Sequence, residues 1–195
     1  MFEGIGNPII PCKKYLLPPG YREVESFTMN NDCYFEIPNM VLYGSDTIMF
    51  SLSRGNACNV LGNYNSADAS NNYSLYVTNN GRYLRYNGGS YNSVLDLNVK
   101  YDVTITPTGC TGMKNNSTWT RKEFQTNGNL FIGITSLNAT SAKFIGTLYG
   151  RITVLNRCIC IPCERISDGT LGYYEAVQRV FVPPSIGTPT AGPYV

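Results

Sequence analysis

Histidine is absent from the sequence. Its absence excludes every mechanism that needs an imidazole, namely Ser-His-Asp and Cys-His hydrolysis, histidine-ligated zinc or haem, and histidine pH switches. Charged residues are also scarce, at 14% of the 195 residues, compared with roughly 25% in an ordinary soluble domain. Uncharged polar side chains, mainly Asn, Ser, Thr and Tyr, must therefore cover much of the surface.

Long basic runs and long apolar runs are missing as well. The 15 basic residues are scattered and the net charge is only +2, so we expect no nucleic-acid partner. No apolar run approaches the roughly 18 residues of a membrane span, and the first residues, MFEGIGNP, do not resemble a signal peptide. We therefore expect synthesis in a cytoplasm, no membrane span, and seven cysteines that remain reduced.

The pattern that is present has a period of two residues and predicts an all-β fold. An Asn-Gly turn at 79–81 between two alternating runs predicts a β-hairpin. Turn residues separate the predicted strands at about ten-residue intervals, as in a sandwich or barrel. These strands cover residues 23–28, 33–37, 47–53, 73–77, 83–86, 101–106, 117–124, 129–134, 144–155 and 157–161. Residues 171–180 fit either one short helix or a turn-rich strand pair.

The two ends of the chain differ from the middle. Residues 1–16 are rich in proline and glycine, which predicts an extended N-terminal arm. The arm also carries apolar side chains at Phe2, Ile9, Ile10 and Tyr15, which gain from burial against another subunit. We expect these four residues to anchor the protein to a partner while residues 17–193 fold as one domain. Residues 183–195 are expected to form an extended C-terminal tail.

Several motifs in this order resemble the laminin-G-like, concanavalin-type modules of phages and prophages of gut bacteria. They are LPPGYREVE at 17–25, LYGRITVL at 148–155, IPC at 161–163, SDGTLGYYEAV at 167–177 and GTPTAGP at 187–193. The resemblance spans about residues 17–193. It implies a two-sheet antiparallel jelly-roll sandwich, concanavalin A-like, with a place on a virion or cell surface.

On this basis we expect a non-enzymatic structural protein of a phage particle, such as a head-fibre, decoration or tail-associated subunit. It would be assembled in the host cytoplasm, displayed on the virion surface, and in contact with capsid or tail proteins and with further copies of itself. A lectin-like sandwich of this kind can bind host surface polysaccharide. The alternatives are a bacterial surface adhesin that binds carbohydrate and, with less support, a glycoside hydrolase.

Four aromatic residues are the candidate glycan-binding side chains. Trp119, Tyr83, Tyr86 and Tyr91 could stack on sugar rings, while neighbouring Asn side chains hydrogen-bond the hydroxyls. The alternative is that these rings fill the core or a subunit interface.

Two carboxylates, Glu23 and Glu25, share one face of a predicted strand. Glycoside hydrolases use such pairs, but the Glu-x-Asp-x-x-Glu strand usual in concanavalin-type hydrolases is missing. We therefore expect a solvent-facing pair without catalysis.

Three cysteines between residues 158 and 163 form an incomplete set of metal ligands. Cys158 and Cys160 share a strand face, and Cys163 follows, but no further ligand set accompanies them. We expect buried thiols that act as small hydrophobic groups and no bound zinc.

Calcium is the only other cofactor to be weighed. Asp46, Asp68, Asp96 and Asp102 lie in or near predicted loops, where calcium ligands occur in such sandwiches. Their spacing is not diagnostic, so we expect turn aspartates and no required cofactor.

Overall fold

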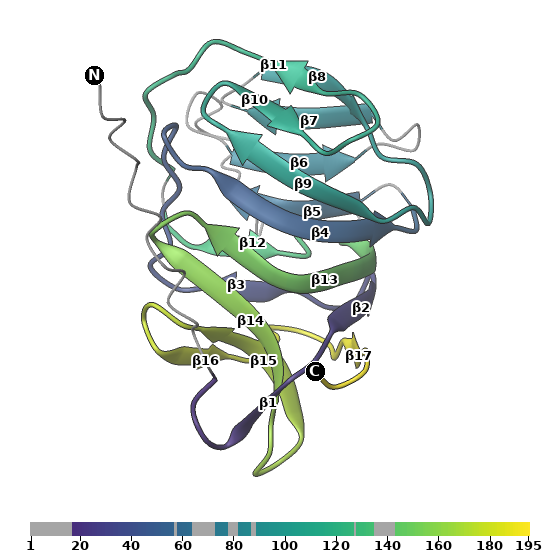
Figure 1. Ribbon diagram of the computed structural model, residues 1–195, viewed down its shortest axis with the longest axis vertical. Coiled ribbons are helices and arrows are strands. Elements are labelled where there is room, and N and C mark those ends of the chain that lie inside the picture. Colours follow the sequence, from purple (N-terminus) through teal and green to yellow (C-terminus); the bar gives the residue numbers. More distant parts are fainter. Residues whose placement is uncertain are drawn as a thin grey trace, which may run out of the picture.

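The computed structural model describes residues 17–56, 58–63, 73–77, 82–86, 89–126, 128–134 and 143–195. Every regular element within these ranges is a β-strand, and the strand ladders are antiparallel (Figure 1). The strands form two sheets, of eleven and six strands. The predicted all-β fold with two antiparallel sheets is therefore confirmed, whereas the jelly-roll topology remains a prediction.

The large sheet has a main path of eight strands, with three further strands joined to its side. In spatial order the path is β11 (Ser117–Thr118), β10 (Gly109–Thr111), β9 (Tyr101–Thr106), β4 (Ile48–Arg54), β13 (Ile145–Val154), β14 (Cys158–Arg165), β15 (Thr170–Glu175) and β16 (Val180–Val182). The side strands are β1 (Tyr21–Glu23), β2 (Ser26–Asn30) and β17 (Thr190–Ala191).

The small sheet lies against the inner face of the large one. Its order is β3 (Phe35–Ile37), β12 (Leu130–Ile132), β5 (Cys58–Asn63), β6 (Tyr73–Val77), β7 (Arg82–Tyr86) and β8 (Gly89–Val94). The pairing of Leu75 with Leu84 confirms the hairpin expected around residues 79–81, although the turn itself lies outside the described residues.

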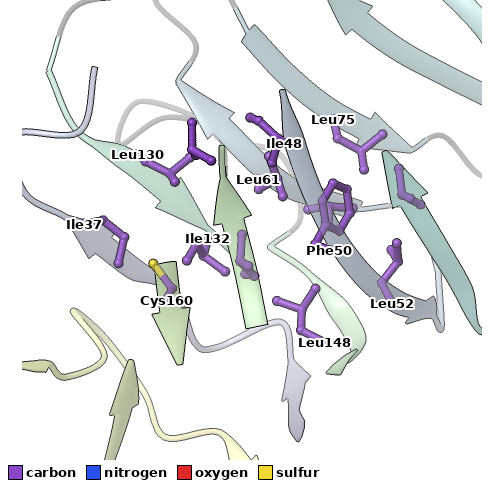
Figure 2. Close-up of a cluster of buried hydrophobic side chains, with 14 of the residues drawn as sticks. Ile37, Ile48, Phe50, Leu52, Leu61, Leu75, Leu130, Ile132, Leu148 and Cys160 are labelled. Atoms are coloured by element: carbon purple, nitrogen blue, oxygen red, sulfur yellow. The ribbon is translucent and has the colours of Figure 1, made fainter. Parts of the chain in front are cut away.

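The main core forms between the two sheets because apolar residues alternate along their strands. In β4 the buried residues are Ile48, Phe50 and Leu52, with partly exposed residues between them. They face buried side chains of the small sheet, such as Leu61 and Leu75 (Figure 2). Burial of a side chain of this size contributes about 1.5–3 kcal/mol, so this alternation accounts for much of the stability of the sandwich.

The long strand β13 changes neighbours halfway along one edge. Its first half, residues 145–149, pairs with β2, and its second half, residues 152–154, pairs with β14. Its other edge pairs with β4 at both ends, with a register shift between Tyr149 and Thr153. Strand β1 in turn pairs with the far half of β14. The sheet is thus split where β1 leads into β2, and we call this place the fork.

A second, smaller apolar cluster lies on the outer face of β14 and β15. We call it the outer cluster, and its buried members are Ile161, Cys163, Tyr174 and Ala176. It exists because β14 is buried on both faces: Cys158 and Cys160 belong to the main core, whereas Ile161 and Cys163 point the other way.

The first described residues cover the outer cluster. Leu17 packs against it, and the ring of Tyr21 lies 5.3 Å from the rings of both Tyr174 and Phe181. The start of the described chain is therefore fixed on the sandwich. The anchoring residues expected in the arm, Phe2, Ile9, Ile10 and Tyr15, all lie outside the described residues.

The C-terminal residues are packed along β2 and β1. Strand β17 pairs with β2, and Val195 N donates a hydrogen bond to Glu23 O at 3.1 Å. The Tyr194 ring lies 3.5 Å from the Arg22 guanidinium, and its hydroxyl donates to Glu164 at 2.6 Å. The tail thus forms part of the sandwich.

Some predicted elements were wrong in extent. The strand expected at residues 117–124 ends at Thr118, and strands β5, β8 and β10 were not predicted. In β5 the local signal is weak because a register shift places Val60 and Leu61 both at 0% exposure, which breaks the alternation. For residues 171–180 the strand pair is the correct alternative, since β15 pairs with β16.

Candidate functional site

The predicted sugar-stacking residue Trp119 is a core residue. Its side chain is only 9% exposed, and its indole Nε1 donates a hydrogen bond to Pro107 O at 3.0 Å. The Tyr91 ring lies 4.7 Å from it and covers it further. A ring enclosed in this way offers no free face to a sugar, so Trp119 is corrected from a binding residue to a packing residue. The side chains of Tyr83 and Tyr86 lie outside the described part of the structure.

The cysteine motif forms no metal centre. The Sγ atoms of Cys158 and Cys160 lie 3.5 Å apart in the main core, while Cys163 is on the opposite face of β14. Burial raises the pKa of the Cys163 thiol to about 12, which disfavours the thiolate that a metal requires. Across the described ranges, no group of three or more Cys, Asp or Glu residues is arranged to hold a metal ion.

The loop aspartates that were weighed as calcium ligands have protein partners. Asp46 accepts hydrogen bonds from Tyr43 N at 2.8 Å and from Arg157 at 2.5 Å. Asp96 pairs with Lys114 at 3.0 Å. Asp68 lies outside the described residues.

The structure instead brings charged side chains together at the fork. A shallow recess of about 270 Å³ opens there on the outer face of the large sheet. Its lining consists of Glu23, Val24, Glu25, Ser51, Lys100, Tyr149, Gly150, Arg151 and Val195. Both residues of the predicted Glu23–Glu25 pair therefore line one recess, together with two cationic residues, Lys100 and Arg151, that the sequence analysis did not single out.

One carboxylate in the recess is held by a guanidinium. Arg151 Nε donates to Glu23 Oε1 at 3.3 Å, and Arg151 Nη2 donates to Glu23 Oε2 at 3.2 Å. This two-pronged geometry fixes both side chains relative to each other. Each oxygen of Glu23 thus accepts one hydrogen bond from Arg151, and the guanidinium neutralises the charge of this carboxylate.

Glu25 is positioned differently, through its backbone. Its N–H donates to Pro193 O at 2.7 Å, and its carbonyl accepts from Gly150 N at 2.8 Å. Its exposed carboxylate, unlike that of Glu23, enters no ion pair among the described residues. The main chain of Glu25 is thus held by two hydrogen bonds, while its side chain is exposed.

The opposite wall of the recess comes from β4, β13 and the residues just before β9. The Lys100 ammonium lies 4.7 Å from the centre of the Tyr149 ring, and the Tyr149 hydroxyl lies 3.2 Å from Ser53 Oγ. The Ser51 hydroxyl donates to Asp102 at 2.5 Å. This wall carries one ammonium and two hydroxyls.

Hydroxyl groups continue from the recess across the outer face of the large sheet. Ser53, Thr147, Thr28 and Thr190 lie opposite one another on four adjacent strands, β4, β13, β2 and β17. The hydroxyls of Thr28 and Thr147 are 3.0 Å apart. The part of the outer face formed by β4, β13, β2 and β17 therefore carries a row of uncharged hydroxyl groups, which agrees with the composition of the chain.

Only part of this recess could be predicted from the sequence. The alternation in residues 147–154 indicates that Thr147 and Tyr149 share a polar strand face, opposite Leu148. Pairing of β13 with β4 then places Ser51 beside Tyr149. That pairing joins residues almost 100 positions apart, and no local pattern predicts it.

Comparisons of the sequence with known proteins give no assignment. No protein-family model and no curated protein matches the chain. The structure has no helix within its described ranges that is long and apolar enough to cross a membrane.

Proposed function

We propose that this protein is a non-enzymatic structural subunit of a bacteriophage particle, either a head fibre, a decoration protein or a tail-associated protein. Residues 1–16 attach it to capsid or tail proteins, and the sandwich is displayed on the virion surface. The motif resemblance supplies the class of particle. The structural support is the way in which the chain leaves the sandwich.

The observation that carries the proposal is the fixed base of the arm. The Tyr21 ring packs against the rings of Tyr174 and Phe181, and strand β1 is paired with β14. Force applied to residues 1–16 therefore reaches a buried cluster and a paired strand directly. Such a base suits a subunit that must stay attached while its exposed face meets other molecules.

The absence of enzymatic activity is proposed from the recess. Glu23 pairs with Arg151 through two hydrogen bonds, an arrangement that fits a structural ion pair better than one member of a hydrolytic carboxylate pair. Incubation with host polysaccharides should release no reducing sugar. If the native protein released reducing sugar and the Glu23→Gln variant did not, this part of the proposal would be contradicted.

Deletion of residues 1–16 tests the attachment. The truncated chain keeps Leu17 and Tyr21, so the melting temperature should fall by less than about 2–4 °C, the shift that 1 kcal/mol gives in a protein of this size. Mass spectrometry of purified particles should detect the full-length protein and not the truncated one.

A matched control distinguishes the effect of the arm's length on attachment from the effect of its apolar side chains. A full-length variant with Phe2, Ile9 and Ile10 replaced by serine keeps all 16 residues, and it should also fail to join particles. Normal incorporation of either variant, inability of the truncated chain to fold, or recovery of the protein with bacterial envelopes instead of particles would each refute the proposed attachment.

A further inference from the structure

Strand β16 forms an open edge of the large sheet. It pairs with β15 on one side, and no strand among the described residues pairs with its other side (Figure 1). An edge of this kind presents backbone N–H and C=O groups to a further strand, and folded proteins usually cover or shorten it. Pro183 and Pro184 follow the strand, but they leave its three residues open. The edge is therefore a place where an extended segment can add.

A shallow groove of about 360 Å³ opens between β16 and the small sheet. Strand β16 and the two prolines after it line one side, and Glu36, Pro38 and Asn129 line the other. Most of this surface is apolar, so it gains from burial. Glu36 accepts a hydrogen bond from Asn129 at 2.5 Å and enters no ion pair among the described residues. The groove therefore suits an apolar segment that also carries a positive charge.

The described part of the chain begins next to this groove. Its first residue, Leu17, packs against the outer cluster, and so does Phe181, which also lines the groove. The Tyr21 ring lies 5.3 Å from the Phe181 ring. Five residues of extended chain span at most about 18 Å, so Cys12 is within that distance of Leu17. The segment just before Leu17 can thus reach the groove along the surface of its own sandwich.

This segment, CKKYL at residues 12–16, has the chemistry that the groove requires. It contains no proline, although prolines stand on both sides of it, so all of its N–H groups can pair with a strand edge. In an extended chain, Lys13 and Tyr15 point to the same side. Tyr15 supplies an apolar ring, and Lys13 supplies a cation for Glu36.

We propose that residues 12–16 of this chain bind in the groove beside β16 as an added edge strand, with the Tyr15 ring in the apolar part and the Lys13 ammonium paired with Glu36. The sandwich thus holds the base of its own arm. Tyr15 is then a contact within the chain and not a contact with the particle.

The docking leaves residues 1–11 for the attachment, and these residues include Phe2, Ile9 and Ile10. This role of residues 1–11 rests on the proposed function, whereas the docking of residues 12–16 does not require a particle. The base of the arm then leaves the sandwich in one fixed direction, which orients each copy relative to the surface that it is attached to.

Cys12 permits a direct test in the full-length protein. Ser185 is exposed and lines the groove, so Ser185→Cys places a second thiol close to the docked segment. Oxidation by air and copper phenanthroline should link Cys12 to the new thiol, and peptide mapping should identify the link. The matched control is Ser167→Cys, in an exposed turn that lies near Gly20 but outside the groove. The yield at position 185 should be at least about tenfold higher, because docking raises the effective concentration of Cys12 there.

The linked product should migrate as a monomer on a non-reducing gel. Equal yields at positions 185 and 167 would overturn the proposal, as would the absence of a link at position 185. A link that joins two copies would overturn it as well, because the occupant would then be the arm of a second copy.

Hydrogen exchange of the β16 amides is an independent measurement that needs no oxidation. In the full-length protein, Tyr15→Ser should speed this exchange about threefold or more, because it removes a ring that is buried in the docked state. Phe2→Ser removes a ring from the arm outside the docked segment, and it should leave the exchange unchanged. Unchanged exchange in Tyr15→Ser, or equal acceleration by both variants, would overturn the proposal.

Incorporation into particles separates the docking from the proposed function. The linked Ser185→Cys protein should still join particles, because residues 1–11 remain free. If only the unlinked form joined, the restriction of the attachment to residues 1–11 would be wrong. A link in a protein that is missing from particles would refute the virion assignment alone. Normal incorporation without a link would refute the docking alone.

Discussion

Two glycines in β13 should differ strongly in their tolerance of alanine. Gly150 lies at the fork with a φ of +59°, and a Cβ built there would meet no atom within 4 Å. Gly146 has a φ of +146°, and its Cβ would lie 2.2 Å from Ser53 O and 3.0 Å from Arg54 Cα. The first substitution is therefore strained only in its backbone, whereas the second also collides with the paired strand.

The expected magnitudes follow from this difference. A non-glycine residue in the left-handed helical region costs roughly 1–2 kcal/mol, which is the whole expected effect of Gly150→Ala. Gly146→Ala also forces β13 away from β4, and overpacking of this kind costs about 1–3 kcal/mol. The backbone strain at Gly146 costs about 1–3 kcal/mol in addition. We therefore expect Gly146→Ala to lower the free energy of unfolding by about 2–6 kcal/mol.

Urea unfolding and thermal melting can measure both values. At about 2–4 °C per kcal/mol, Gly150→Ala should lower the melting temperature by about 2–8 °C and Gly146→Ala by about 4–24 °C. Gly150→Asn should cost less than Gly150→Ala, because asparagine tolerates the left-handed region better. Equal losses for the two alanine variants would refute the register of β13 against β4.

Two further predictions concern titratable groups. Burial raises the pKa of Cys33, Cys110 and Cys163 to about 12, so a thiol reagent at pH 8 should label none of the three without denaturant, and rapid labelling of the native protein would contradict their burial. A hydrogen bond from the Tyr194 hydroxyl lowers the pKa of Glu164. A lowered carboxyl pKa stabilises the fold above the unfolded pKa, and this stabilisation is lost as the pH falls through the folded pKa. Glu164→Gln should therefore reduce the loss of stability on acidification, and an unchanged acid slope measured by urea unfolding would argue against the contact.

The fold class was predictable because it follows from local alternation. Buried Ile48, Phe50 and Leu52 alternate with partly exposed residues, as the sequence indicates. The strand pair at 171–180 was left open against a helix, since Leu171, Tyr174 and Val177 recur at helical spacing. The structure decides for the strand pair, because β15 pairs with β14. This pairing buries Tyr173 in the main core and Tyr174 in the outer cluster.

The candidate site was predictable only in its acidic half. Glu23 and Glu25 share a strand face by their spacing alone. The cationic residues Lys100 and Arg151 are brought to the same recess by the order of strands in the sheet, over more than 70 residues of sequence. The prediction for Trp119 was wrong for the same reason. Its exposure depends on contacts with Tyr91 and Pro107, and no local sequence pattern predicts these contacts.

The arm and the recess constrain each other because both start from β1. Tyr21 supports the base of the arm and Glu23 lines the recess, and residues two apart on a strand are only about 6.6 Å apart on the same face. A particle attached directly at Tyr21 would therefore crowd the recess. A segment of 16 residues can span up to about 53–58 Å when extended, which is enough to keep the recess clear of the surface to which the arm is bound. Among the expected anchoring residues Phe2, Ile9, Ile10 and Tyr15, contacts with the particle near Phe2 would therefore leave the recess most open.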